Sequence, residues 1–191
     1  KSGLINNTDV SHYRLALHLS IALTILSLVF WFILENFNVM KFVNKINNKF
    51  LILLFIIILF QIILGVFLAG LNGGLLYNSW PDMNGHFLPS DIDKNDLINT
   101  EIFDNPSVIQ FYHRISAYVL IVFLIILNFK CYKNNVESMP ILIFNLAILF
   151  QIILGIVTLL TGVKIYYASL HQLGSVFVLI SFLNIFYKNT N

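Results

Sequence analysis

Three histidines, His18, His113 and His171, each lie inside a long apolar run of this sequence, a few residues from one end of the run. Ionisable side chains are rare in the interior of a lipid bilayer unless they have a function. We expect His113 and His171 to lie at a similar depth of about 7 Å in their membrane spans, the length of roughly five residues at 1.5 Å per residue. Equal depth lets two neutral imidazoles approach one plane from opposite faces, as in a haem held by two histidines. The spacing therefore predicts a haem iron site within a membrane.

Neighbouring residues favour this interpretation, but two others are open. Gly174 follows His171 by one turn and Ser116 follows His113 at the same offset, which leaves room for a porphyrin edge. Arg114 lies where it can pair with a haem propionate. Alternatively, each histidine only hydrogen-bonds a neighbouring helix. A transporter with a proton relay is the third interpretation, and the lack of acidic residues within the runs counts against it.

Five apolar runs must position these histidines, at residues 15–34, 50–71, 108–129, 141–160 and 170–186. About twenty residues of helix cross the hydrocarbon core of a bilayer. The runs lack the alternating pattern of barrel strands. We therefore predict an all-α fold, a polytopic membrane bundle of five transmembrane helices, with the run at 108–129 as a shorter span.

The composition excludes most other classes of protein. The chain is 58% hydrophobic and 10% charged, which is outside the range of a soluble domain and predicts a lipid bilayer as its environment. A net charge of +2 is too small to indicate a nucleic-acid partner. The single cysteine, Cys131, can form no disulfide within the chain.

The charges in the connections predict the orientation. Lys41, Lys45 and Lys49 lie in one connection without an acid, and Lys130 and Lys133 lie in the next connection on the same side, so both should face the cytoplasm. The segment 73–109 holds six acidic residues against Lys94 alone, as expected of an outer loop; these are Asp82, Asp91, Asp93, Asp96, Glu101 and Asp104. We expect an inner-membrane protein with its N-terminus outside and its C-terminus in the cytoplasm.

The string ILFQIILG occurs twice, at residues 58–65 and 148–155, with Gln61 and Gln151 at equivalent positions. Low complexity is the alternative to a true repeat, since Ile, Leu and Phe dominate this chain. Both glutamines fit hydrogen bonding between helices better than a place beside a cofactor. A looser match aligns the segment around His18 with that around His171, which implies a repeat of four spans. Residues 1–48 then hold the last helix of one half, and residues 49–191 hold a complete second half.

Four segments of the chain resemble the C-terminal part of haem A synthases of the alphaproteobacterial and mitochondrial type. They are VSHYRLALHLSIAL at 10–23, AGLNGGLLYNSWPDMNGHFLP at 69–89, VIQFYHRISAY at 108–118 and ASLHQLGSV at 168–176. Together they cover most of the chain in the order of that family. The combination of NSWPDMNGH, QFYHR and LHQ is specific to it.

The resemblance implies eight transmembrane helices in two related halves with two histidines each. By resemblance, His113 and His171 are the axial ligands of a haem b in the C-terminal half. His18 then resembles an iron ligand of the N-terminal half, where a methyl group of haem O is oxidised to the formyl group of haem A for cytochrome oxidase. The other histidine and the glutamate of that half would precede Lys1, so we expect the catalytic residues there, either in a longer chain or in one piece of a split enzyme.

The resemblance also implies partners, namely haem O synthase or cytochrome oxidase assembly proteins, with haem O and haem A as the small molecules bound. A second function class fits the same histidines, that of a non-catalytic membrane cytochrome b that passes electrons to a partner. Both functions require haem, so haem binding alone does not separate them. The sequence that precedes Lys1 would distinguish the two functions.

Overall fold

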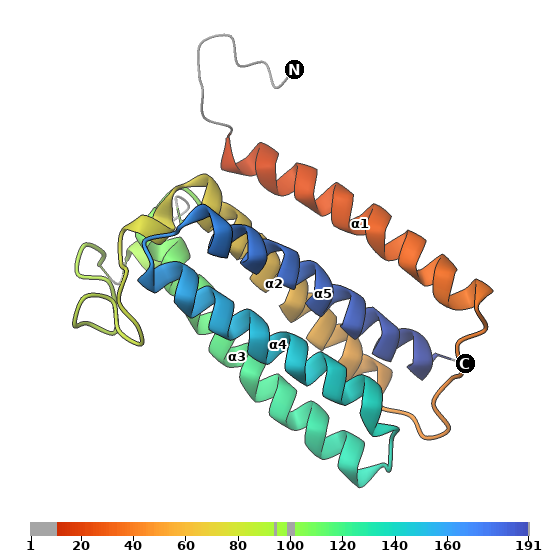
Figure 1. Cartoon of the computed structure of the whole chain (residues 1–191). Coiled ribbons are helices and arrows are strands. Elements are labelled where there is room, and N and C mark those ends of the chain that lie inside the picture. The colour runs from red at the N-terminus through yellow and green to blue at the C-terminus, as the bar shows by residue number, and fades with distance from the viewer. Residues whose placement is uncertain (1–10, 94, 99–101, 191) are drawn as a thin grey trace.

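The five predicted spans are five α-helices in the computed structural model, which describes residues 11–93, 95–98 and 102–190 (Figure 1). The helices are α1 (His12–Asn36), α2 (Asn48–Gly70), α3 (Pro106–Lys133), α4 (Ser138–Leu160) and α5 (Ile165–Asn189). Each is long and apolar enough to cross a membrane, and the described part of the chain has no β-strand. The predicted fold class is confirmed, and the chain is a multi-pass membrane protein. Lys94 and Glu101, counted above among the loop charges, lie outside the described residues, as does Lys1.

The helices form two antiparallel hairpins with α1 along one side (Figure 1). The most extensive packing is that of α4 with α5 and of α2 with α3, whereas α1 packs on α2 and α5. Helices α3 and α4 approach each other little, but Asn128 and Asn145 exchange two amide hydrogen bonds between them, at 3.0 and 2.7 Å. Interhelical hydrogen bonds of this kind hold membrane helices together without a large packed surface.

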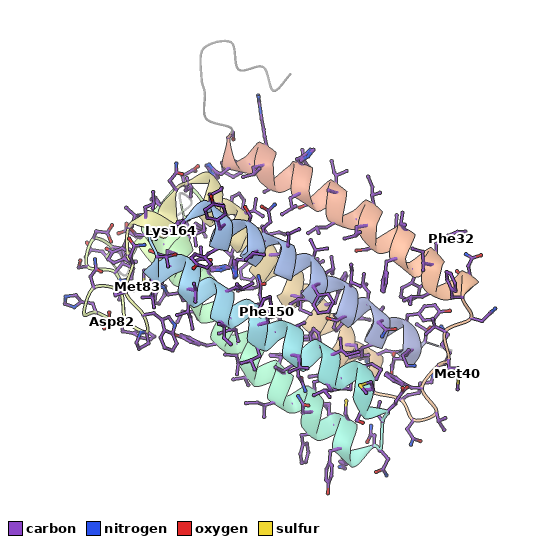
Figure 2. The ribbon with its side chains drawn as sticks, viewed as in Figure 1. Phe32, Met40, Asp82, Met83, Phe150 and Lys164 are labelled. Atoms are coloured by element: carbon purple, nitrogen blue, oxygen red, sulfur yellow. The ribbon has the colours of Figure 1, made fainter. Side chains whose placement is uncertain are left out.

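The bundle has two unlike ends. At the long-loop end lie the loop 71–105 and the turn between α4 and α5; at the short-loop end lie the connections 37–47 and 134–137. Figure 2 shows Asp82, Met83 and Lys164 at the long-loop end and Met40 at the other. The described part of the long loop contains only two short 3-10 helices, Gly73–Leu75 and Asp96–Ile98. This agrees with a loop built mainly of turns.

Helix α3 differs from its predicted range, because it is the longest helix, with 28 residues. The Asn105 side chain accepts hydrogen bonds from the backbone N–H groups of Ser107 and Val108, and Pro106 occupies the first helical position. Lys130 and Lys133 lie in the last turn, where positive charge favours a helix C-terminus. The helix thus starts before the apolar run and ends after it, and the long loop ends at Asn105 and not at residue 109.

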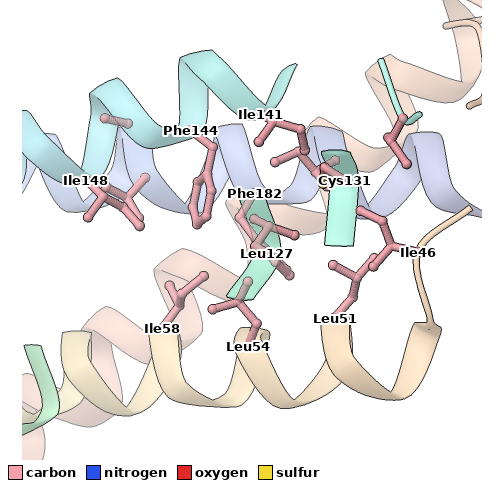
Figure 3. Packing of buried hydrophobic residues seen from close by; sticks show 14 of the residues in the cluster. Ile46, Leu51, Leu54, Ile58, Leu127, Cys131, Ile141, Phe144, Ile148 and Phe182 are labelled. Atoms are coloured by element: carbon pink, nitrogen blue, oxygen red, sulfur yellow. The ribbon is translucent and has the colours of Figure 1, made fainter. Parts of the chain in front are cut away.

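The main apolar core fills the half of the bundle nearer the short-loop end (Figure 3). Leu51 and Leu54 of α2, Leu127 of α3, Phe144 of α4 and Phe182 of α5 are completely buried in it. Along α2 and α4 the last fully buried residues of this core are Ile58 and Ile148, the first residues of the two ILFQIILG strings. The next turn toward the long-loop end holds Gln61 and Gln151, and a second buried cluster that includes Leu64 follows on α2.

The last described residues of the chain form hydrogen bonds and an ion pair with the connections at the short-loop end. Lys41 Nζ donates to the carbonyl oxygen of Tyr187 at 3.0 Å, and the side chain of Asn189 bonds both the N–H and the carbonyl of Ile46, at 2.7 and 2.8 Å. Lys188 pairs with Glu137 at 3.0 Å. These contacts join α5 to the α1–α2 and α3–α4 connections and leave the long-loop end to be organised separately.

Candidate functional site

The structure places His113 and His171 at similar depth on two different helices. His113 is seven residues beyond the start of α3, and His171 is six residues beyond the start of α5. At 1.5 Å per residue, both lie about 10 Å from the helix starts. Both side chains are partly buried. The fold therefore places the two residues that the sequence pairs at the same level of the bundle, on helices that both pack against α2.

A glutamine and a glycine of α2 hold His113. The Gln61 side-chain nitrogen donates to the backbone carbonyl of His113 at 3.1 Å and lies 3.2 Å from ring atom Nδ1. One turn along α2, a Cβ atom on Gly65 would lie 3.2 Å from Cε1 of His113. The imidazole thus lies directly on the backbone of α2.

A glutamine and a glycine of α4 hold His171 in the same way. The Gln151 side-chain nitrogen donates to the backbone carbonyl of His171 at 2.7 Å, and a Cβ atom on Gly155 would lie 2.9 Å from Cε1 of that ring. The prediction that both glutamines form hydrogen bonds between helices is confirmed. The repeated string thus makes equivalent contacts in the α2–α3 and α4–α5 hairpins, a repeat of two helices beside the repeat of four spans predicted from the match around His18 and His171.

The small residues one turn after each histidine contact the side chains of the two glutamines. Ser116 donates a hydrogen bond to Gln61 Oε1. A Cβ atom on Gly174 would collide with Gln151 Oε1, so Gly174 provides the space for that side chain. Both positions were predicted to leave room for a porphyrin edge. In the structure they accommodate the neighbouring glutamine instead.

Two buried polar atoms at this site lack hydrogen-bond partners, and the residues present suit the binding of a haem. His171 Nδ1 and Gln151 Oε1 are buried without a hydrogen-bond partner. Buried polar atoms normally have partners, so unpartnered ones indicate a group still to be bound or a bond still to form. Among the described residues no group of three or more His, Cys, Asp and Glu side chains gathers as a metal cage. Two imidazoles at one depth without carboxylates suit haem iron, which needs only axial ligands from the protein.

His18 takes no part in this pair. It lies six residues beyond the start of α1 and its side chain is exposed, although the helix itself packs on α2 and α5. Its depth matches that of the other two histidines. A role for His18 as an iron ligand remains a prediction that concerns residues outside this bundle.

Arg114 holds the long loop. Its guanidinium donates to the backbone carbonyls of Tyr77, Ser79 and Asp82 at 2.9, 3.0 and 2.7 Å. Next to these bonds, the N–H of Gly85 and the hydroxyl of Ser79 lower the pKa of the Asp82 carboxyl below its ordinary value. This network fixes the loop over the start of α3, one residue from His113.

We expect Arg114→Lys to loosen this loop. A lysine ammonium keeps the charge but not the rigid fork that reaches three carbonyls. Losing even one charged hydrogen bond, at about 1.5–3 kcal/mol, should raise amide exchange of residues 77–82 roughly tenfold or more. Hydrogen–deuterium exchange of the chain in lipid nanodiscs measures this, with Lys133→Ala at the far end of α3 as control. Unchanged exchange in Arg114→Lys would contradict the anchoring role.

Two loop carboxylates, interpreted from the sequence as solvated charges, have specific partners. Asp104 lies 3.1 Å from His12 Nε2 and accepts a hydrogen bond from the Tyr13 hydroxyl at 2.9 Å, which ties the start of α1 to the residues before α3. Asp91 accepts hydrogen bonds from Tyr77 and from Ser107, the latter at 2.6 Å. No spacing in the sequence marks these contacts, since the partners lie far apart along the chain.

The fold and the site define a class, that of multi-pass membrane helical bundles with two partly buried histidines at one depth. Sequence comparison then gives the family. A profile of the COX15-CtaA family, described as cytochrome oxidase assembly protein, matches residues 1–183, and the chain belongs to this family.

Its relatives are haem A synthases. That of Pelagibacter ubique is 58% identical over 190 residues, covering 100% of this chain and 56% of the relative. That of Wolbachia pipientis wMel is 38% identical, covering 92% and 50%, and that of Agrobacterium fabrum is 37% identical, covering 95% and 51%. The chain thus spans about half the length of the curated relatives it matches. No solved structure matches the chain.

Proposed function

We propose that residues 49–191 are the haem-binding C-terminal half of a haem A synthase, in which His113 and His171 are the axial ligands of one haem b. The observation that carries this proposal is the pairing of two imidazoles at one depth, each held by an equivalent glutamine and glycine. When bound, haem iron supplies one-electron redox chemistry. The chain's own contribution is to orient the two rings and to keep water away with the apolar core beneath them.

The complete protein, on this proposal, oxidises a methyl group of haem O to the formyl group of haem A. The names of the relatives support this activity. The proposal places the catalytic residues in a further half, and the relatives are long enough to contain one. Residues 1–48 then supply the last helix of that half, and His18 is its iron ligand in this chain. Haem O synthase and cytochrome oxidase assembly proteins are the proposed partners, at the inner membrane with the long-loop end outside.

Arg114 has a second role in this proposal. A guanidinium carries five N–H donors, of which the loop carbonyls use three in the structure. The remaining donors and the positive charge can meet a haem propionate. Arg114→Lys, which keeps the charge, should therefore retain haem while it loosens the loop.

Reconstitution with haem tests the proposal directly. The purified 191-residue chain in nanodiscs, titrated with haem b, should bind one haem and give the reduced-minus-oxidised spectrum of a low-spin cytochrome. Nanodiscs without protein are the control for haem that partitions into lipid. A high-spin spectrum, or no saturable binding, would contradict axial ligation by two histidines.

A further inference from the structure

The two copies of ILFQIILG make the same two contacts with a histidine of the next helix. In each copy the glutamine donates to the histidine backbone carbonyl, and the glycine four residues later lets the ring touch the helix backbone. Glutamine and glycine at positions i and i+4 lie on one helix face. The remaining six residues of the string are apolar. The polar bond fixes the height of the histidine, and the glycine fixes the distance of its ring from the neighbouring helix.

We propose that Gln61 with Gly65, and Gln151 with Gly155, are positioning residues that set the orientation of the two axial imidazoles. This inference rests on the proposed function, since it gives these residues their role toward haem. We call each glutamine–glycine pair a histidine seat. The repeat in the sequence is then a repeat of histidine seats, one for each side of the iron.

The two histidine seats are not equivalent. At the α2–α3 seat the Ser116 hydroxyl satisfies Gln61 Oε1, whereas at the α4–α5 seat the corresponding residue is Gly174 and Gln151 Oε1 has no partner. His171 Nδ1 is also unpartnered and buried. The ring of His171 nevertheless lies closer to its glycine: its Cε1 atom is 2.9 Å from the point that an alanine Cβ would occupy there, against 3.2 Å for His113. The His171 seat is therefore tighter in space but less restrained by hydrogen bonds.

This difference predicts unequal responses to the same substitution. A methyl group on Gly155 must displace the His171 ring, because real Cβ contacts do not occur at that distance, whereas a methyl group on Gly65 requires a shift of only a few tenths of an ångström. Groups that orient a metal ligand typically change metal affinity 10- to 100-fold when removed. We expect Gly155→Ala to weaken haem binding by roughly this factor and Gly65→Ala to weaken it less.

The experiment compares four variants of the 191-residue chain in nanodiscs: Gly155→Ala, Gly65→Ala, Gln151→Leu and Gln61→Leu. Haem b affinity is titrated, and the electron paramagnetic resonance of the ferric form reports the relative orientation of the two imidazole planes. Leucine is close to glutamine in size and is at home in lipid, so Gln151→Leu should keep the helices packed and lose only the bond to His171. Ile153→Ala, a half-exposed position on the same helix, is the matched control.

The histidine seats are supported if the resonance signal shifts and if haem affinity falls more in Gly155→Ala than in Gly65→Ala. Ile153→Ala should leave both the signal and the affinity unchanged. They are overturned if Gly155→Ala and Gln151→Leu retain the affinity and the signal of the unmodified chain. The outcome for the underlying function is separate. If His113→Ala and His171→Ala also retain the haem affinity and the resonance signal, axial ligation by these histidines is wrong. If the two histidine variants lose haem while the glutamine and glycine variants do not change, only the inference about the histidine seats is wrong. Thermal unfolding of each variant confirms that the bundle has formed.

Discussion

Alanine in place of His113 or His171 is expected to abolish the low-spin haem spectrum of this chain. Each imidazole would supply one of only two protein bonds to the iron, so its removal would leave one axial position without its histidine. The loss of affinity should exceed the roughly 10- to 100-fold change that follows from removing a group that merely orients a ligand. Optical titration with haem b and the ferric resonance spectrum measure both effects.

These variants should fold, which makes the result interpretable. Alanine is the most favourable helix residue, and neither histidine belongs to the apolar core. His86→Ala removes an exposed imidazole from the long loop and serves as the control, with an unchanged spectrum. A low-spin signal that survives in either His113→Ala or His171→Ala would show that the pair does not clamp the iron.

The second large effect is a loss of haem A formation in His18→Ala, which we expect only in a complete protein. A chimera with the preceding half of the Pelagibacter relative, 58% identical to this chain, restores the partners that the exposed His18 needs on our proposal. Expressed with a haem O synthase in cells that lack haem A, this chimera should accumulate haem A. The His18→Ala chimera should fall to background, because an iron ligand of the proposed catalytic half is lost.

Extraction and chromatographic separation of haem O and haem A give the measurement. Phe32→Ala, an exposed position near the other end of α1, is the control and should retain haem A formation (Figure 2). Haem A levels in the His18→Ala chimera equal to those of the parent would remove His18 from the reaction. That result would leave the haem b assignment of His113 and His171 untouched, because the 191-residue chain tests it separately.

The sequence alone was sufficient for the spans, because the length of an apolar run and the thickness of a bilayer decide where a helix crosses. The third span was underestimated for a local reason. Ser107, in its first turn, is polar but buried beneath the long loop, and a hydropathy criterion begins the span only after it. The cap at Asn105 and the proline after it were the signals in the sequence for the earlier start.

The partners of the polar residues were decided by tertiary structure. Apolar residues surround helix α2 almost evenly, so its hydrophobic pattern does not indicate which face meets α3. The rotation of each helix about its own axis determines that Gln61 meets His113, that Gln151 meets His171, and that Gly174 receives a glutamine. The same holds for Arg114, since its three carbonyl acceptors lie more than thirty residues earlier in the chain.

The sequence by itself thus determined the number of helices, the common depth of the histidines and the family resemblance, because these follow from residue types along one chain. Only the tertiary structure decided which side chains face one another. In lipid an unpaired polar group costs free energy, so the preferred rotation of each helix is the one that pairs its few polar atoms. The partners lie on other helices, which the sequence of one helix does not specify.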